Sequence, residues 1–204
     1  MSNIESAMEN DPYYQVRPLM DLIGAKEARG DYNLAYGNKK DKFTDMSLNE
    51  LLDWQKEYVK SGSPSSAVGK YQIIRPTLKG LMRNMKLTGD EKFTPEMQDA
   101  MIVELMKGRN YDDWIEGKIS DEEFANNLAQ EWASFPVVTD MEVTDKKTGK
   151  KRKVARGQSY YEGVGTNKAL ITPEEVLESL RINKPQYMTM DELLGDYDYF
   201  GTKI

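Results

Sequence analysis

The stretch VRPLMDLIGAKEARGDYN at residues 16–33 decides how the rest of the chain is interpreted. Its apolar residues recur at helical spacing, and the Arg29-Gly30 pair that follows them predicts a helix stop. Glu27 is therefore expected at the C-terminal end of an amphipathic helix. The next segment, residues 31–45, is rich in Gly, Asn, Asp and Tyr, which predicts irregular structure or a small hairpin that could line a cleft.

Further helices are predicted by N-terminal capping signals along the chain. Two capping boxes and two Thr-Pro pairs mark helix starts: Ser47 with Glu50, Ser120 with Glu123, Thr94-Pro95 and Thr172-Pro173. The expected helices end near residues 61, 133, 107 and 182, and another runs from about residue 77 to 85. Residues 141–155 instead predict a β-hairpin. The expected fold class is α+β, mostly helical, with a small β region near the first helix.

The length of 204 residues fits one domain with short appendages. We expect an N-terminal arm at residues 1–12, a domain at residues 13–182 that carries an inserted hairpin at residues 137–157, and a C-terminal tail at residues 183–204. The tail is rich in Tyr, Asp and Met, and it could dock on a partner or fold back on the domain.

The amino-acid composition limits the kinds of catalysis that the chain can use. The chain has no Cys and no His, so zinc hydrolysis and catalysis by a His base are disfavoured, whereas glycoside cleavage needs only carboxyl groups. We expect no cofactor and no metal. The net charge of -6 argues against a dedicated nucleic-acid binder, and no apolar stretch is long enough to span a membrane. The N-terminus has no signal-peptide pattern, which predicts synthesis in a host cytoplasm.

Three further patterns occur in a fixed order. They are KEARGDYN at residues 26–33 with Tyr36-Gly37, SSAVGKYQ at residues 65–72, and FTPEMQDA at residues 93–100 followed by WASFP at residues 132–136. Together, over roughly residues 15 to 170, they resemble the lysozyme-like muramidases of bacteriophages, especially the lambda-type endolysins, which are lytic transglycosylases. The resemblance implies a lysozyme-like fold and cleavage of peptidoglycan glycan strands. Three positions depart from the residues common in that family: Ala28, Arg29 and Lys70. None of these differences removes the glutamate that serves as the acid in that family.

Glu27 is the expected catalytic acid, because the resemblance places the family's Glu at the end of this helix. A helix C-terminus and burial under a sugar both raise the pKa of a carboxyl. The alternative is a solvated glutamate or one paired with Lys26 or Arg29. The Asp expected about nine residues on in hydrolytic phage lysozymes is replaced by Tyr36, which favours a transglycosylase with a single Glu. A hydrolytic muramidase stays open, with a second carboxylate from Asp31, Asp41 or Asp45.

Five residues are expected to bind substrate. Ser66, Tyr71 and Gln72 are predicted to form a cleft wall that orients the N-acetyl group and hydrogen-bonds Glu27, although Tyr71 could be core and Ser66 an ordinary loop residue. Tyr160 or Tyr161 is predicted to hold the Glu27 carboxyl, as the late tyrosine of the resembled family does, or to pack on the core. Trp132 is expected in the core, on a helix with Leu128 and Phe135.

A basic run at residues 146–153 lies on the predicted hairpin tip and is either a solvated turn or a contact for an anionic partner. The expected partners are peptidoglycan glycan strands and other virion proteins, the latter through the tail or this hairpin. Because the net charge is negative, we expect a virion component that acts on the cell wall rather than a free lysis enzyme. The competing functions are a non-catalytic phage structural protein with the same fold and a nucleic-acid binder that uses the lysine hairpin.

Overall fold

Helix α2 (Arg17–Ala28) forms as the sequence predicts. Pro18 stands in its first turn, where its missing N–H is harmless, and the apolar face of the helix is buried. The helix ends because Arg29 adopts the left-handed conformation, with φ of 54°. The N–H groups of Arg29 and Gly30 then bond to the carbonyls of Ala25 and Gly24, which closes the C-terminus. Glu27 therefore lies in the last turn.

The computed structural model describes residues 11–145, 149–163 and 168–183. Nearly all of the predicted N-terminal arm and C-terminal tail lies outside these residues, as do residues 146–148 of the basic run. Within the described part, no helix is long and apolar enough to cross a membrane.

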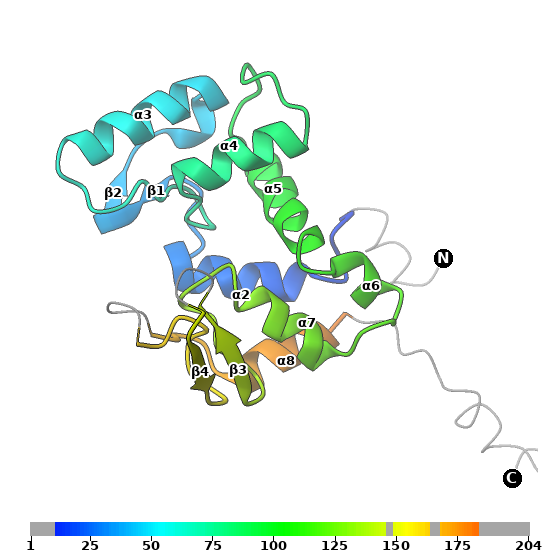
Figure 1. Cartoon of the computed structure of the whole chain (residues 1–204). Coiled ribbons are helices and arrows are strands. Elements are labelled where there is room, and N and C mark those ends of the chain that lie inside the picture. Colours follow the sequence, from blue (N-terminus) through cyan, green and yellow to red (C-terminus); the bar gives the residue numbers. More distant parts are fainter. Residues whose placement is uncertain (1–10, 146–148, 164–167, 184–204) are drawn as a thin grey trace, which may run out of the picture.

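The elements form two groups joined by α5 (Pro95–Lys107), as Figure 1 shows. The first group contains α3 (Leu48–Lys60), α4 (Arg75–Asn84), β1 (Leu34–Ala35) and β2 (Lys39–Lys40), together with the short 3-10 turns η1 (Tyr36–Asn38) and η2 (Phe43–Asp45). The second contains α2, α7 (Asp121–Leu128), α8 (Pro173–Arg181), β3 (Met141–Thr144) and β4 (Lys151–Val154). The short α6 (Tyr111–Ile115) links α5 to α7. The α+β class is confirmed.

Two separate antiparallel strand pairs make up the β structure of the described residues. In the pair β1–β2, Leu34 faces Lys40, which confirms the small hairpin after α2. In the pair β3–β4, Met141 faces Val154, which confirms the strands of the inserted hairpin. The basic run is partly neutralised there, because Lys151 pairs with Glu142 across the strands at 2.7 Å.

The structure confirms the predicted capping residues. Some helices begin or end at other residues than predicted, and one helix was not predicted. Ser47 and Thr172 form complete capping boxes, because each exchanges hydrogen bonds with the Glu three residues on. The helix α4 begins two residues earlier than predicted, since Pro76 fits its first turn. The helix α7 ends at Leu128 and not near residue 133, and α6 carried no capping signal that predicted it.

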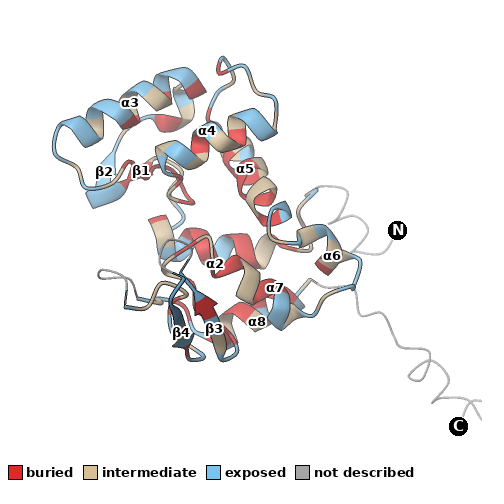
Figure 2. Cartoon of the chain, in the orientation of Figure 1, coloured by how far each residue is buried: buried red, intermediate tan, exposed pale blue. Residues whose placement is uncertain are grey.

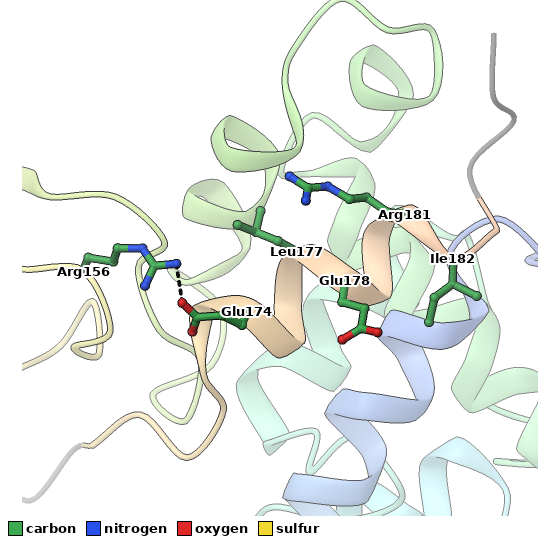
Figure 3. A pocket seen from close by; sticks show the side chains of 6 residues that line it. All are labelled: Arg156, Glu174, Leu177, Glu178, Arg181 and Ile182. Carbon is green, nitrogen blue, oxygen red and sulfur yellow. Dashed lines mark hydrogen bonds and ion pairs between the residues drawn. The ribbon is translucent and has the colours of Figure 1, made fainter. Parts of the chain in front are cut away.

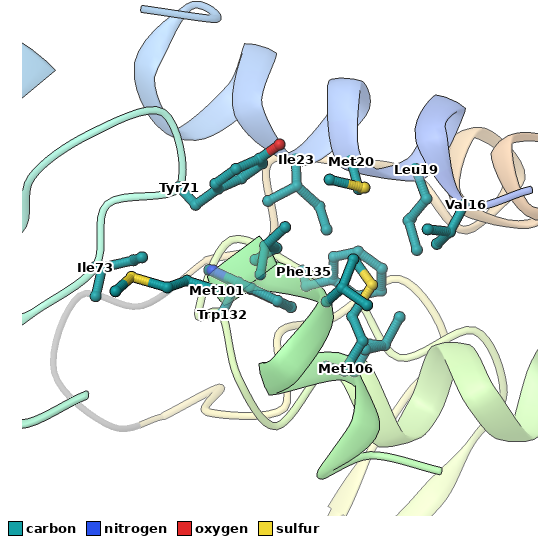
Figure 4. Close-up of a cluster of buried hydrophobic side chains, with 14 of the residues drawn as sticks. Val16, Leu19, Met20, Ile23, Tyr71, Ile73, Met101, Met106, Trp132 and Phe135 are labelled. Atoms are coloured by element: carbon teal, nitrogen blue, oxygen red, sulfur yellow. The ribbon is translucent and has the colours of Figure 1, made fainter. Parts of the chain in front are cut away.

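The hydrophobic core packs against the buried face of α2, as Figures 2 and 4 show. Its labelled members in Figure 4 are Val16, Leu19, Met20, Ile23, Tyr71, Ile73, Met101, Met106, Trp132 and Phe135. Trp132 is a core residue as predicted, with 8% exposure, but it is not helical because α7 has already ended. Burial of each large side chain contributes about 1.5–3 kcal/mol, so this cluster fixes the position of α2.

Candidate active site

The Glu27 carboxyl accepts a hydrogen bond from the hydroxyl of Ser134, a residue 107 positions further along the chain. Glu27 is partly buried in the last turn of α2. Ser134 belongs to the turn at residues 132–136, which follows α7. Sequence reasoning matched this turn to the resembled family and assigned it only a packing role. The serine between two aromatic core residues was the signal that could have revealed the contact.

The two cations beside Glu27 in sequence have other partners. Lys26 Nζ lies 3.3 Å from Glu175 Oε1 of α8. The Arg29 guanidinium donates to Asn38 Oδ1 at 2.9 Å. The alternative that Glu27 forms an ion pair with Lys26 or Arg29 is therefore wrong.

Burial is the main influence on the pKa of Glu27. Burial raises the pKa of the Glu27 carboxyl above its ordinary value, and the hydrogen bond from Ser134 offsets only part of that rise. The helix end acts in the same direction as burial, because its unpaired carbonyls carry partial negative charge. A carboxyl that keeps its proton towards neutral pH can act as a general acid.

Of the three carboxylates considered as a second catalytic group, two have partners of their own and the third is exposed. Asp31 pairs with Lys40 at 2.9 Å, and its pKa is lowered first by that hydrogen bond and then by the N–H of Asn33. Asp41 accepts from the indole N–H of Trp54 at 3.0 Å. Asp45 is exposed in η2. None of the three shares a hydrogen bond with Glu27 in the part of the chain that the structure describes.

Ser66 and Gln72 both brace the loop at residues 65–74. Ser66 Oγ accepts the N–H of Arg75 at 2.9 Å, and its carbonyl accepts from the buried Gln55 at 2.8 Å. Gln72 adopts a left-handed φ of 49°, and its amide donates to the carbonyls of Leu34 and Gly69, each at 3.0 Å. Neither expected hydrogen bond to Glu27 is present, and the contact of these residues with substrate stays a prediction.

Tyr71 is a core residue, with 1% exposure, so the alternative that it packs inside the domain is confirmed. Its hydroxyl donates to Asp99 Oδ1 at 2.7 Å, and burial strongly raises the pKa of this phenol. Asp99 of α5 also accepts from Tyr32 and pairs with Arg17 of α2. Lys70 lies beside this cluster, 2.8 Å from Asp21 of α2. The cluster joins three segments that are far apart in sequence.

Tyr160 and Tyr161 pack at the base of the inserted hairpin. Their rings meet edge to face at 5.2 Å, and the Arg152 guanidinium lies 5.7 Å from the Tyr160 ring. The Tyr161 hydroxyl donates to the carbonyl of Gln130 at 2.6 Å and not to Glu27. The hydrogen bond predicted from a late tyrosine to Glu27 comes instead from Ser134.

A family model described as Endolysin matches residues 25–165, a span that includes both Glu27 and Ser134. The chain belongs to the endolysin family. Endolysins degrade bacterial peptidoglycan, and this endolysin is accordingly a lysozyme-like glycosidase that acts on peptidoglycan. It is therefore an enzyme and not a non-catalytic structural protein.

Among solved structures, the endolysin is similar to a bacteriophage lambda lysozyme complexed with a chitohexasaccharide, with 14% identity and a TM-score of 0.49. The alignment covers 83% of this endolysin and 94% of that chain. A search of the curated proteins found no match.

A hollow of about 460 Å³ lies on the endolysin's helix α8 and does not include Glu27 (Figure 3). Arg156 and Glu174, paired at 2.8 Å, form one side, and Leu177, Glu178, Arg181 and Ile182 form the rest. The two carboxylates that line this hollow are solvent-exposed, whereas Glu27 is partly buried. No group of three or more His, Cys, Asp or Glu residues within the described ranges is arranged to hold a metal ion.

Proposed function

We propose that this endolysin cleaves the β-1,4 bond between N-acetylmuramic acid and N-acetylglucosamine by lytic transglycosylation, with Glu27 as its single catalytic carboxyl. The observation that carries the proposal is the setting of Glu27. It is partly buried at a helix end, a neutral hydroxyl is its hydrogen-bond partner, and the adjacent cations Lys26 and Arg29 are engaged elsewhere. This setting favours the protonated acid that glycoside cleavage requires.

In the proposed reaction, Glu27 acts first as an acid and then as a base. It donates its proton to the glycosidic oxygen as the bond from that oxygen to C1 of the muramoyl sugar breaks. The muramoyl 6-hydroxyl oxygen then bonds to C1 and loses its proton to the Glu27 carboxylate. The products are a free 4-hydroxyl on N-acetylglucosamine and a 1,6-anhydro muramoyl end. Glu27 returns to its starting state, and no water is consumed.

The carboxylates near Glu27 in sequence favour this route over hydrolysis. A retaining or inverting hydrolase needs a second carboxylate that faces the scissile bond. Asp31 is tied to Lys40 with a lowered pKa, which makes it a weak base, and Asp41 is held by Trp54. One Glu is enough for the intramolecular reaction, because the sugar supplies its own nucleophile.

We further propose that Gln72, Tyr160 and Tyr161 contact the glycan, because all three are partly exposed. Ser66 and Tyr71 have buried side chains whose hydroxyls are engaged inside the protein, so in this proposal they shape the site indirectly. The Ser66 hydroxyl links the loop at residues 65–74 to the start of α4, and the Tyr71 hydroxyl links it to α5.

The products of digested sacculi test the reaction type. We expect the released muropeptides to end in 1,6-anhydro-N-acetylmuramic acid, which mass spectrometry distinguishes from the reducing end by the mass of one water. A hydrolytic muramidase digested in parallel gives the reference for reducing ends. If the endolysin yields only reducing ends, the transglycosylase proposal is wrong, and Asp31 and Asp45 are the next residues to replace.

We also propose that the endolysin acts as a virion component during entry into the cell. The net charge of -6 supports this, because a free enzyme that searches for an anionic wall gains from positive charge, whereas a tethered one does not. We expect mass spectrometry of washed virions to find the chain at a stoichiometric copy number, and deletion of residues 185–204 to remove it. Its absence from virions, with accumulation in the infected cytoplasm before lysis, would identify a free lysis enzyme.

A further inference from the structure

The turn that carries Ser134 is fixed on both sides by backbone hydrogen bonds. On one side, the N–H of Phe135 bonds to the carbonyl of Trp132 at 3.1 Å. On the other, Pro136 forms a β-bridge with Ser159, and the N–H of Val137 bonds to the carbonyl of Gln158 at 2.8 Å. The carbonyl of Ser134 itself accepts the N–H of Leu170 at 2.7 Å. The backbone of Ser134 is therefore held at its own carbonyl and at the next residue, Phe135.

Two buried aromatic side chains anchor the same turn. Trp132 is 8% exposed and Phe135 is fully buried, and both belong to the core against which α2 packs. Movement of the Ser134 backbone away from Glu27 would have to displace one of these rings, at the cost of core packing. The hydroxyl is thus a preorganised donor aimed at the end of α2.

We propose that Ser134 is a positioning residue for the reaction: it holds the Glu27 carboxyl in one orientation and stabilises the carboxylate that forms when the proton is transferred. This inference rests on the proposed role of Glu27 as the acid. The Ser134 proton is not transferred. While one carboxyl oxygen of Glu27 carries the proton to the glycosidic oxygen, the other accepts the Ser134 hydrogen bond, which strengthens as negative charge develops.

A neutral donor suits this task better than a cation. A Lys or Arg in the same place would hold Glu27 in its ionised form and remove the acid. The charged groups around Glu27 are arranged to avoid this. Lys26 pairs with Glu175, the charged residue that α8 presents to it, and Arg29 turns to Asn38. Ser134 therefore contributes polar stabilisation without fixing the protonation state.

The test is a titration of Glu27 in the full chain with ¹³C-labelled glutamate carboxyls, followed by NMR, with no substrate present. We expect Ser134→Ala to move the Glu27 titration to higher pH, because the carboxylate has lost its donor. Ser134→Thr keeps a hydroxyl and should titrate close to wild type. Ser179→Ala is the control, because Ser179 is a buried serine whose hydroxyl also makes a hydrogen bond inside the protein, at 2.7 Å to the carbonyl of Val176.

Kinetics on purified sacculi provide the second measurement. In Ser134→Ala, kcat should fall about tenfold with KM nearly unchanged, the size expected for the loss of one hydrogen bond to a carboxylate. The decline of the rate on the alkaline side should also move to higher pH. Ser134→Thr should recover most of the rate.

An unchanged Glu27 titration in Ser134→Ala would overturn this inference. If Ser134→Ala does not fold, Ser134→Cys serves instead, because a thiol is a weak donor of similar size and the chain has no other Cys. It should shift the titration in the same direction, and no shift would again be decisive. Activity retained after replacement of Glu27 would overturn the proposed function, whereas the substrate-free titration tests the Ser134 contact by itself.

Discussion

Replacing Glu27 with Gln is expected to lower the rate of peptidoglycan cleavage by about three orders of magnitude, the contribution typical of a positioned acid or base. Gln keeps the size of the side chain and can still accept the Ser134 hydrogen bond, but it has no proton to donate. The rate is measured by muropeptide release from sacculi. Glu122→Gln, at an exposed glutamate on α7, is the matched control and should retain full activity.

Glu27→Gln should not destabilise the fold, and its effect on the free energy of unfolding depends on pH. The folded pKa of Glu27 is raised above its ordinary value of 4.5, so the stability of the wild type falls as pH rises from that value through the folded pKa. Glu27→Gln removes this penalty. Its Tm should match the wild type at acid pH and equal or exceed it at pH values above the folded pKa. A variant that is inactive because it is unfolded, or one that retains more than a few per cent of activity, contradicts the assignment.

Asp99→Ala is expected to cost about 3 kcal/mol of unfolding free energy, because it removes the common acceptor of a buried network. Its carboxylate receives hydrogen bonds from Tyr71 at 2.7 Å and Tyr32 at 3.0 Å, and it pairs with Arg17. The loss stays at the lower end of the range for buried pairs, because Arg17 retains its bond to Asp11 at 2.7 Å. Urea denaturation measures the effect.

Asp53→Ala provides the control for Asp99, because Asp53 is an exposed carboxylate on α3 and should change stability by less than about 0.5 kcal/mol. Asp99→Ala should also lower activity, since the network fixes α2, which carries Glu27, against α5 and the loop at residues 65–74. An Asp99→Ala protein as stable as the Asp53 control would show that the buried network contributes little to the fold.

The sequence alone determined the features whose physics is local. Ser47, Thr94 and Thr172 marked helix starts correctly, because a cap is satisfied by N–H groups within three residues of itself. The position of Glu27 at the end of α2 followed from the apolar period and the Arg29-Gly30 stop for the same reason. The inserted hairpin followed from its alternating residues and its turn.

Only the tertiary structure decided which side chains meet. Ser134 contacts Glu27 across 107 residues of sequence. Asp99 contacts Arg17 and Tyr32, which are 82 and 67 residues away from it. Such contacts depend on how the core packs α2 against the rest of the chain, and no local pattern encodes that packing. Tyr71 shows the difference: its neighbours in sequence suggested a cleft wall, but burial of its ring placed it in the core, with its hydroxyl on Asp99. A buried polar side chain forms hydrogen bonds with the groups that the packing of the core brings close to it.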